Sequence, residues 1–210
     1  MELLDIVDEN GQPTGEVVDR EFAHRNGIRH RTSHVWVLRV KRNCRKNIEE
    51  INLNDLEMML QRRSDTKDSN PGKLDISSAG HIKAGTGYVD SAIRELQEEL
   101  GITATPSELI FCGKKRVSYM KKFYGEEFFD NQVSNVYIMY KDIDAADIKF
   151  QVEEISEVLW MPFTDVYNMV MNKSEDSCIS EDEMYILENY LNDNIRFLLA
   201  KKLNFEILIQ

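Results

Sequence analysis

The 210-residue chain has few cysteines, prolines and histidines: three, four and four. Cys44, Cys112 and Cys178 are widely separated, lack the Cys-x-x-Cys spacing of a zinc knuckle, and leave one thiol over in any disulfide scheme. No apolar run approaches the length of a membrane span, and the N-terminus lacks the basic start and apolar stretch of a secretion signal. We therefore expect free thiols, no membrane partner and a cytoplasmic location.

Positive charge is also scarce, with 26 Lys and Arg against 37 Asp and Glu and a net charge of −11. This balance argues against a nucleic-acid polymer as partner, because such binding needs a basic surface. An anionic ligand must instead be met by local cations or by metal ions. At 42% hydrophobic residues, the chain is long enough for one buried core, so we expect a single domain over residues 1–210. A homodimer is left open.

Several short segments have the composition of β-strands. Leu3–Val7 and Glu16–Val18 flank a turn that contains Asn10-Gly11, which predicts an N-terminal β-hairpin within residues 1–29. His34–Val40 and Leu56–Leu60 predict two core strands joined by a long exposed connection. Later strand candidates are Val136–Tyr140 and Glu157–Met161.

Beyond Pro162 the pattern becomes helical and predicts an extension over residues 164–210. Ser180 and Glu183 have the spacing of a capping box, and the apolar positions that follow recur with helical period. Strands followed by helices, with one strong internal helix, indicate an α/β layered domain whose core spans about residues 30–163.

That internal helix is Tyr88–Leu100, which lacks Pro and Gly and is followed by Gly101, a residue favoured just past a helix end. At about 100° per residue, its apolar side chains share one sector, which predicts the buried face. The members of this sector are Ala92, Ile93, Leu96 and Leu100.

Three carboxylates project from the neighbouring sector of the same helix. Glu98 and Glu99 follow Glu95 by three and four residues, so their Cβ atoms lie roughly 5–6 Å from that of Glu95 and the charges repel. A solvated helix face is the ordinary explanation in an acidic protein. The alternative is a divalent cation that supplies the missing positive charge, with Arg94 holding one carboxylate in place.

The loop before this helix, Leu74 to Thr86, decides between these interpretations, because its two glycines allow tight turns and close approach to a ligand. Loop and helix together resemble the Nudix box: Gly, five residues, Glu, seven residues, then Arg-Glu-apolar-x-Glu-Glu-x-Gly-apolar. The first Glu is replaced by Thr86. The matching positions are Gly80, Arg94, Glu95, Leu96, Glu98, Glu99, Gly101 and Ile102.

The resemblance implies an α/β/α sandwich with a mixed sheet and an Mg²⁺- or Mn²⁺-dependent hydrolase that cleaves a phosphoanhydride bond of a nucleoside diphosphate derivative or similar small diphosphate. It implies metal ligands at Glu95, Glu98, Glu99 and the carbonyl of Gly80. Glu98, Glu99 and Arg94 are the implied catalytic residues. The general base is open between Glu98 or Glu99 and a residue of a later loop, for which Glu153 and Glu154 are the candidates.

A wider likeness, over roughly Leu3 to Phe163, is to the Nudix branch related to isopentenyl diphosphate isomerase. That isomerase moves protons with a cysteine and a glutamate, and the matching positions here are Ala79 and Gln132. Neither side chain is a carboxylic acid or a thiol, so isomerisation by that route is not expected. The alternatives kept are an isomerase-like enzyme and a non-catalytic ligand-binding protein, although a pure binder would not need all three box glutamates.

The isomerase also holds a metal with histidines, so a second site at His24, His30 and His81 is left open. Candidate phosphate-binding residues are Arg62 and Arg63, which end a predicted strand, and Lys83 in the loop. A few aromatic residues are candidates for stacking on a base, but most are expected in the core. These are Trp36, Tyr119, Phe123 and Tyr137.

Overall fold

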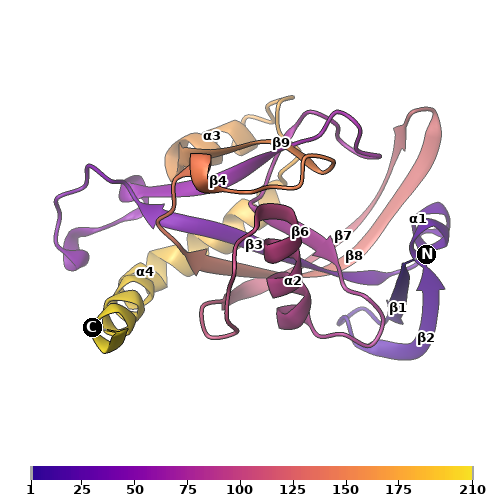
Figure 1. Ribbon diagram of the computed structural model, residues 1–210. Helices are drawn as coiled ribbons and strands as arrows, with labels where there is room; N and C mark the ends of the chain where they lie inside the picture. Colours follow the sequence, from indigo (N-terminus) through magenta and orange to yellow (C-terminus); the bar gives the residue numbers. More distant parts are fainter. Residues whose placement is uncertain (1, 210) are drawn as a thin grey trace.

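The computed structural model describes residues 2–209 and has a mixed β-sheet at its centre (Figure 1). Its strand order is β5-β4-β3-β8-β7, with β6 also pairing to β3 and β9 to β4. The β3–β8 pair is parallel and the other pairs are antiparallel. The strands are β3 (His30–Val40), β4 (Leu56–Arg63), β5 (Leu74–Asp75), β6 (Ser78–His81), β7 (Ile110–Phe123), β8 (Glu126–Tyr140) and β9 (Ile155–Pro162).

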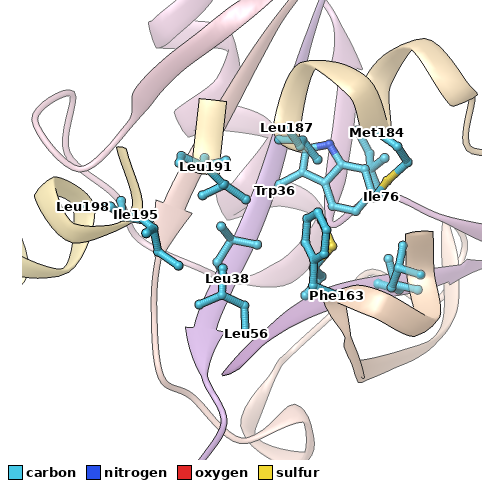
Figure 2. Close-up of a cluster of buried hydrophobic side chains, with 14 of the residues drawn as sticks. Trp36, Leu38, Leu56, Ile76, Phe163, Met184, Leu187, Leu191, Ile195 and Leu198 are labelled. Atoms are coloured by element: carbon cyan, nitrogen blue, oxygen red, sulfur yellow. The ribbon is translucent and has the colours of Figure 1, made fainter. Parts of the chain in front are cut away.

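Helices cover both faces of this sheet because β3 alternates its side chains between two cores. Val35 and Val37 face α2 (Tyr88–Leu100), whereas Trp36 and Leu38 face α3 (Phe163–Met171) and α4 (Glu181–Ile209). Figure 2 shows Trp36 packed beneath Met184 and Leu187 of α4. The expected α/β/α sandwich with C-terminal helices is confirmed. Among residues 2–209 no helix combines the length and apolar character needed to cross a membrane.

The N-terminal segment forms a separate two-stranded sheet of β1 (Leu3–Val7) and β2 (Pro13–Asp19), followed by α1 (Arg20–Asn26). A buried ion pair ties this hairpin to the sheet, since Arg31 Nη2 lies 2.6 Å from Asp5 Oδ2. The same Asp5 oxygen accepts a hydrogen bond from the Gly85 backbone, and Arg31 also donates to the Thr86 carbonyl. The hairpin therefore holds the loop that precedes α2.

The strands predicted from composition exist, but most are longer than expected. The β1–β2 hairpin and α2 lie where the sequence placed them. The segment Val136–Tyr140 is only the buried end of β8, which pairs with β7 in a long hairpin that extends past the body of the sheet in Figure 1. The connection between β3 and β4 is not wholly exposed, because Ile51 is buried in the core.

The capping box predicted at the start of α4 is wrong. The side chain of Ser180 has no hydrogen-bond partner, although its backbone carbonyl accepts from the Glu183 and Met184 amides. The Glu183 carboxylate points away from the helix start and accepts hydrogen bonds from side chains of the sheet. A buried lysine competes for this carboxylate more strongly than an exposed backbone amide does.

Candidate active site

Helix α2 packs closely against strand β6 because residue 80 of the strand is a glycine. A Cβ atom at Gly80 would lie 2.1 Å from Cδ of Glu95, so the close approach of strand and carboxylate requires glycine. The helix ends at Gly101, whose φ of 65° places it in the left-handed region and whose amide bonds back to the helix. Local sequence thus fixes where the helix ends and how near its acidic face lies to the loop.

The three box glutamates lie on this face, and two of them share one cation. Arg94 Nη2 is 2.6 Å from Glu95 Oε1, and Arg94 Nη1 is 2.7 Å from Glu98 Oε2. The arginine also donates to the backbone carbonyl of His81. The sequence suggested that Arg94 holds one carboxylate, and the structure shows that it contacts two. Two of the three carboxylates thereby share a single positive charge.

The three box glutamates differ in how far their side chains are exposed to solvent. The Glu98 side chain is 51% exposed, that of Glu95 is 13% exposed, and Glu99 is buried. Burial raises the pKa of Glu99 to about 8, even though the Ser78 hydroxyl donates to its Oε2 at 2.8 Å. Burial also raises the pKa of Glu95, against the opposing effect of Arg94. Such carboxyl groups are poised to exchange a proton for a cation.

A cavity of about 820 Å³ lies on the sheet face that α4 covers, and none of the three box glutamates lines it. Gly80 lies on its wall, so the cavity reaches the box loop directly. The other walls come from the segment between β4 and β5, the β7–β8 hairpin and the start of α4. Its size is that of a pocket for a nucleotide-sized ligand.

Of the three phosphate-binding candidates, only Arg63 lines this cavity. Its guanidinium pairs with Asp75 at 2.9 Å and donates to the Ser69 carbonyl. Arg62 is held by ion pairs to Glu157 and Asp176 instead. Lys83 is exposed and does not line the cavity.

The other aromatic and acidic candidates are similarly divided. Trp36 and Tyr137 are buried in the core, and Phe123 packs against Phe128, whereas Tyr119 lines the cavity. Among the candidate bases, Glu153 is exposed and Glu154 forms an ion pair with Lys67. The positions that match the isomerase, Ala79 and Gln132, both line the cavity.

The structure brings His24, His30 and His81 together at one end of the cavity. One ligand atom from each lies within 4.8 Å of the others, and the Nε2 atoms of His24 and His81 are 3.0 Å apart. Nδ1 of His24 and of His30 lies within hydrogen-bond distance of a backbone carbonyl, so each Nε2 is an acceptor; that of His24 is engaged by His81, and that of His30 has no partner. Burial lowers the pKa of all three, that of His24 to about 4. Neutral imidazoles with converging lone pairs are suitable metal ligands.

Sequence reasoning missed a buried ionic group on the cavity floor. Glu183 Oε2 lies 2.9 Å from Lys115 Nζ, and Oε1 accepts from His34 Nδ1 at 2.8 Å and from Trp36 Nε1 at 3.0 Å. Glu183 and Lys115 are 68 residues apart, so no local pattern connects them. The one available signal was a lysine at an inward-facing position of a strand.

Comparison with known proteins shows which family the chain belongs to. A model described as the NUDIX domain matches residues 50–181, which is more than half of the chain. The chain belongs to the Nudix family. This confirms the resemblance found in the box residues, and it confirms the expectation of a Nudix hydrolase at the level of the family.

Relatives within the Nudix family cover most of this chain. Nudix hydrolase 3 of Arabidopsis thaliana is 36% identical over 86% of this chain, but the match spans only 22% of the plant protein. An uncharacterized Nudix hydrolase of Clostridium acetobutylicum is 32% identical over 82% of this chain and 75% of its own length. A crystal structure from Deinococcus radiodurans aligns with a TM-score of 0.60 at 18% identity, over 90% of this chain and 99% of that one, and supports the fold.

Proposed function

We propose that this Nudix protein hydrolyses a phosphoanhydride bond in a nucleoside diphosphate derivative or a similar small diphosphate, with Mg²⁺ or Mn²⁺ bound at the acidic face of α2. The observation that carries the proposal is the set of three carboxylates on one face of α2, of which Glu95 packs against Gly80, a residue that also lines the nucleotide-sized cavity. Among the described residues, Arg94 is the one cation in salt-bridge distance of this cluster, and it pairs with Glu95 and Glu98. Carboxylate and carbonyl oxygens suit hard divalent cations.

The residues present fit such an ion. Glu95, Glu98 and Glu99, with the Gly80 carbonyl, would hold it. When bound, the ion makes a coordinated water more acidic and neutralises charge on the phosphoryl group. Arg94 orients two of the carboxylates, and Arg63 stands on the cavity wall where it can bind a substrate phosphate.

Among the residues open as general base, the structure favours Glu99. Its pKa of about 8 suits proton transfer near neutral pH. Glu154 is already engaged by Lys67, and Glu153 is exposed. Glu98 remains the alternative, because it is the most exposed of the three box glutamates.

We further propose that His24, His30 and His81 bind a second ion, of a metal that favours imidazole nitrogen such as Zn²⁺. The buried Nε2 of His30 has no hydrogen-bond partner, and neither has Oδ1 of the neighbouring Asp130. Metal analysis of the dialysed protein should find one tightly held ion, lost in His30→Gln. Equal metal content in the two proteins would contradict this site.

Incubation with a panel of nucleoside diphosphate derivatives tests the main proposal. With Mg²⁺ or Mn²⁺ at least one compound, such as ADP-ribose, should yield two phosphate monoesters, and H₂¹⁸O should label one of them. Conversion of isopentenyl diphosphate to its isomer, followed by NMR, would favour the isomerase alternative. Binding of panel compounds without hydrolysis would favour a non-catalytic protein. A cytoplasmic location, a single domain and a homodimer stay predictions.

A further inference from the structure

The floor of the 820 Å³ cavity is polar, although the rest of the same sheet face is apolar. On β3, Trp36 and Leu38 pack in the core under α4, but Thr32 and His34 line the cavity. On the neighbouring strands, Gln132 and Lys115 also line it. A sheet that buries hydrocarbon over most of one face has thus kept polar groups over one patch.

These floor residues are fixed by contacts that leave donors unused. Thr32 Oγ1 donates to Gln132 Oε1 at 3.2 Å, which orients the Gln132 amide. The amide nitrogen of Gln132 has no hydrogen-bond partner among the described residues. Lys115 Nζ pairs with Glu183 at 2.9 Å and has two further protons. Above them the buried hydroxyl of Ser180 has no partner either. Three side chains therefore offer hydrogen bonds to the cavity.

A hydrocarbon group in this cavity would remove water from Gln132 and Lys115 without replacing its hydrogen bonds, and would leave the buried Ser180 hydroxyl unpaired. Each polar group left buried and unpaired costs about 1–3 kcal/mol. A ligand with hydroxyl or ring heteroatoms would instead satisfy them. The cavity is also much larger than a diphosphate alone requires, so it has room for a group attached to the diphosphate.

We infer that this cavity is a specificity subsite for a hydroxyl-bearing group attached to the substrate diphosphate, selected over a hydrocarbon chain by Gln132, Lys115 and Ser180. The inference rests on the proposed function for the position of the diphosphate near Gly80. It narrows the substrate to diphosphates of sugars or nucleosides and excludes prenyl diphosphates. Glu183 and Thr32 act as positioning residues, because they orient Lys115 and Gln132.

Three non-cleavable probes test this inference separately from turnover. They are the α,β-methylene analogue of ADP-ribose, geranyl methylenediphosphonate, and methylenediphosphonate without an attached group, each titrated calorimetrically with Mg²⁺. The wild-type protein should bind the ADP-ribose analogue at least about tenfold more tightly than the geranyl analogue. Gln132→Leu should reduce that preference about tenfold, the equivalent of one or two lost hydrogen bonds. Binding of methylenediphosphonate should not change.

Ser180→Ala provides a second variant that should fold normally, because the hydroxyl caps nothing in the structure. This variant should weaken the binding of the ADP-ribose analogue and leave the binding of the other two probes unchanged. Gln12→Leu is the matched control, an exposed glutamine in the β1–β2 turn that should keep the wild-type preference. A geranyl analogue that binds as tightly as the ADP-ribose analogue, an unchanged preference in Gln132→Leu, or no binding of any probe would overturn the inference. If the protein keeps its binding preference for the ADP-ribose analogue but hydrolyses no diphosphate, the proposed function is wrong and the subsite is still supported.

Discussion

Two acidic groups stand on opposite faces of the sheet, and their surroundings differ. On α2, Glu95 and Glu98 share the single cation Arg94, and Glu99 has no cationic partner within salt-bridge distance among the described residues. On α4, the single carboxylate of Glu183 accepts hydrogen bonds from Lys115, His34 and the Trp36 indole. One site has more negative charge than the protein neutralises, and the other has its charge fully satisfied.

The pKa values follow this difference. Burial raises the pKa of Glu99 to about 8. Burial alone would also raise the pKa of Glu183, but His34 and Lys115 outweigh it and lower that pKa well below its usual value. A carboxylate that the protein satisfies is a structural element, whereas carboxylates left in excess are suited to an added cation. The sequence around each glutamate alone would not have distinguished Glu183 from the glutamates of α2.

The largest expected effect is on stability, in Glu183→Gln. This change leaves Lys115 buried without its counter-charge, and breaking a buried pair costs about 3–5 kcal/mol. Urea unfolding should show this loss in the free energy of unfolding. The double variant Lys115→Met with Glu183→Gln should recover much of it, because no lone charge remains. A cost in Glu183→Gln below about 1 kcal/mol would mean that water reaches the pair and that the two acidic sites are alike.

The same carboxylate should make the fold sensitive to acid. Because the folded state lowers the pKa of Glu183, its contribution is fully present above the unfolded value of about 4.5 and is lost as the pH falls below it. The stability difference between wild type and Glu183→Gln should therefore be constant near neutral pH and shrink below pH 4.5. Unfolding curves over that range check the sign. A difference that grows in acid would refute it.

In the α2 cluster the expected effect is on rate. Glu98→Gln keeps the shape of the side chain and removes a charge that attracts a cation, so turnover should fall on the order of 100-fold. Stability should change by less than about 0.5 kcal/mol, since the loss of an exposed ion pair with Arg94 and the relief of repulsion from Glu95 are both small and oppose each other. Glu16→Gln, an exposed change on β2, is the matched control and should keep full activity. A fully active Glu98→Gln would restore the solvated-face interpretation.

A smaller effect is expected at the contact between strand and helix. In Gly80→Ala the new Cβ would displace the Glu95 carboxylate, which is the end of a flexible side chain, so the fold should lose less than about 1 kcal/mol. Turnover should fall about tenfold because a proposed ligand moves. Gly87→Ala, whose Cβ would meet Asp90 at 3.1 Å, should retain the wild-type metal dependence. Equal losses in both variants would show that Gly80 serves only the fold.

Local patterns predicted much of this molecule. The spacing in Tyr88–Leu100 and the turn at Asn10-Gly11 specify their own structures, so α2 and the N-terminal hairpin were found. The β7 strand was missed because it lies at the edge of the sheet and is rich in lysine, which hides the alternation of a buried strand. The cavity floor was missed because its contacts join residues about 68–149 positions apart.

Direct titration of Mg²⁺ into the metal-free protein tests the central claim, that the α2 carboxylates form the cation site and Glu183 does not. Calorimetry at pH 7.5 should show saturable binding to the wild type, weakened at least about tenfold in Glu98→Gln and unchanged in Glu16→Gln. Magnesium is the appropriate ion because it prefers oxygen ligands and avoids the histidine cluster. Binding of equal affinity in wild type and Glu98→Gln, or no saturable binding to the wild type, would contradict the account.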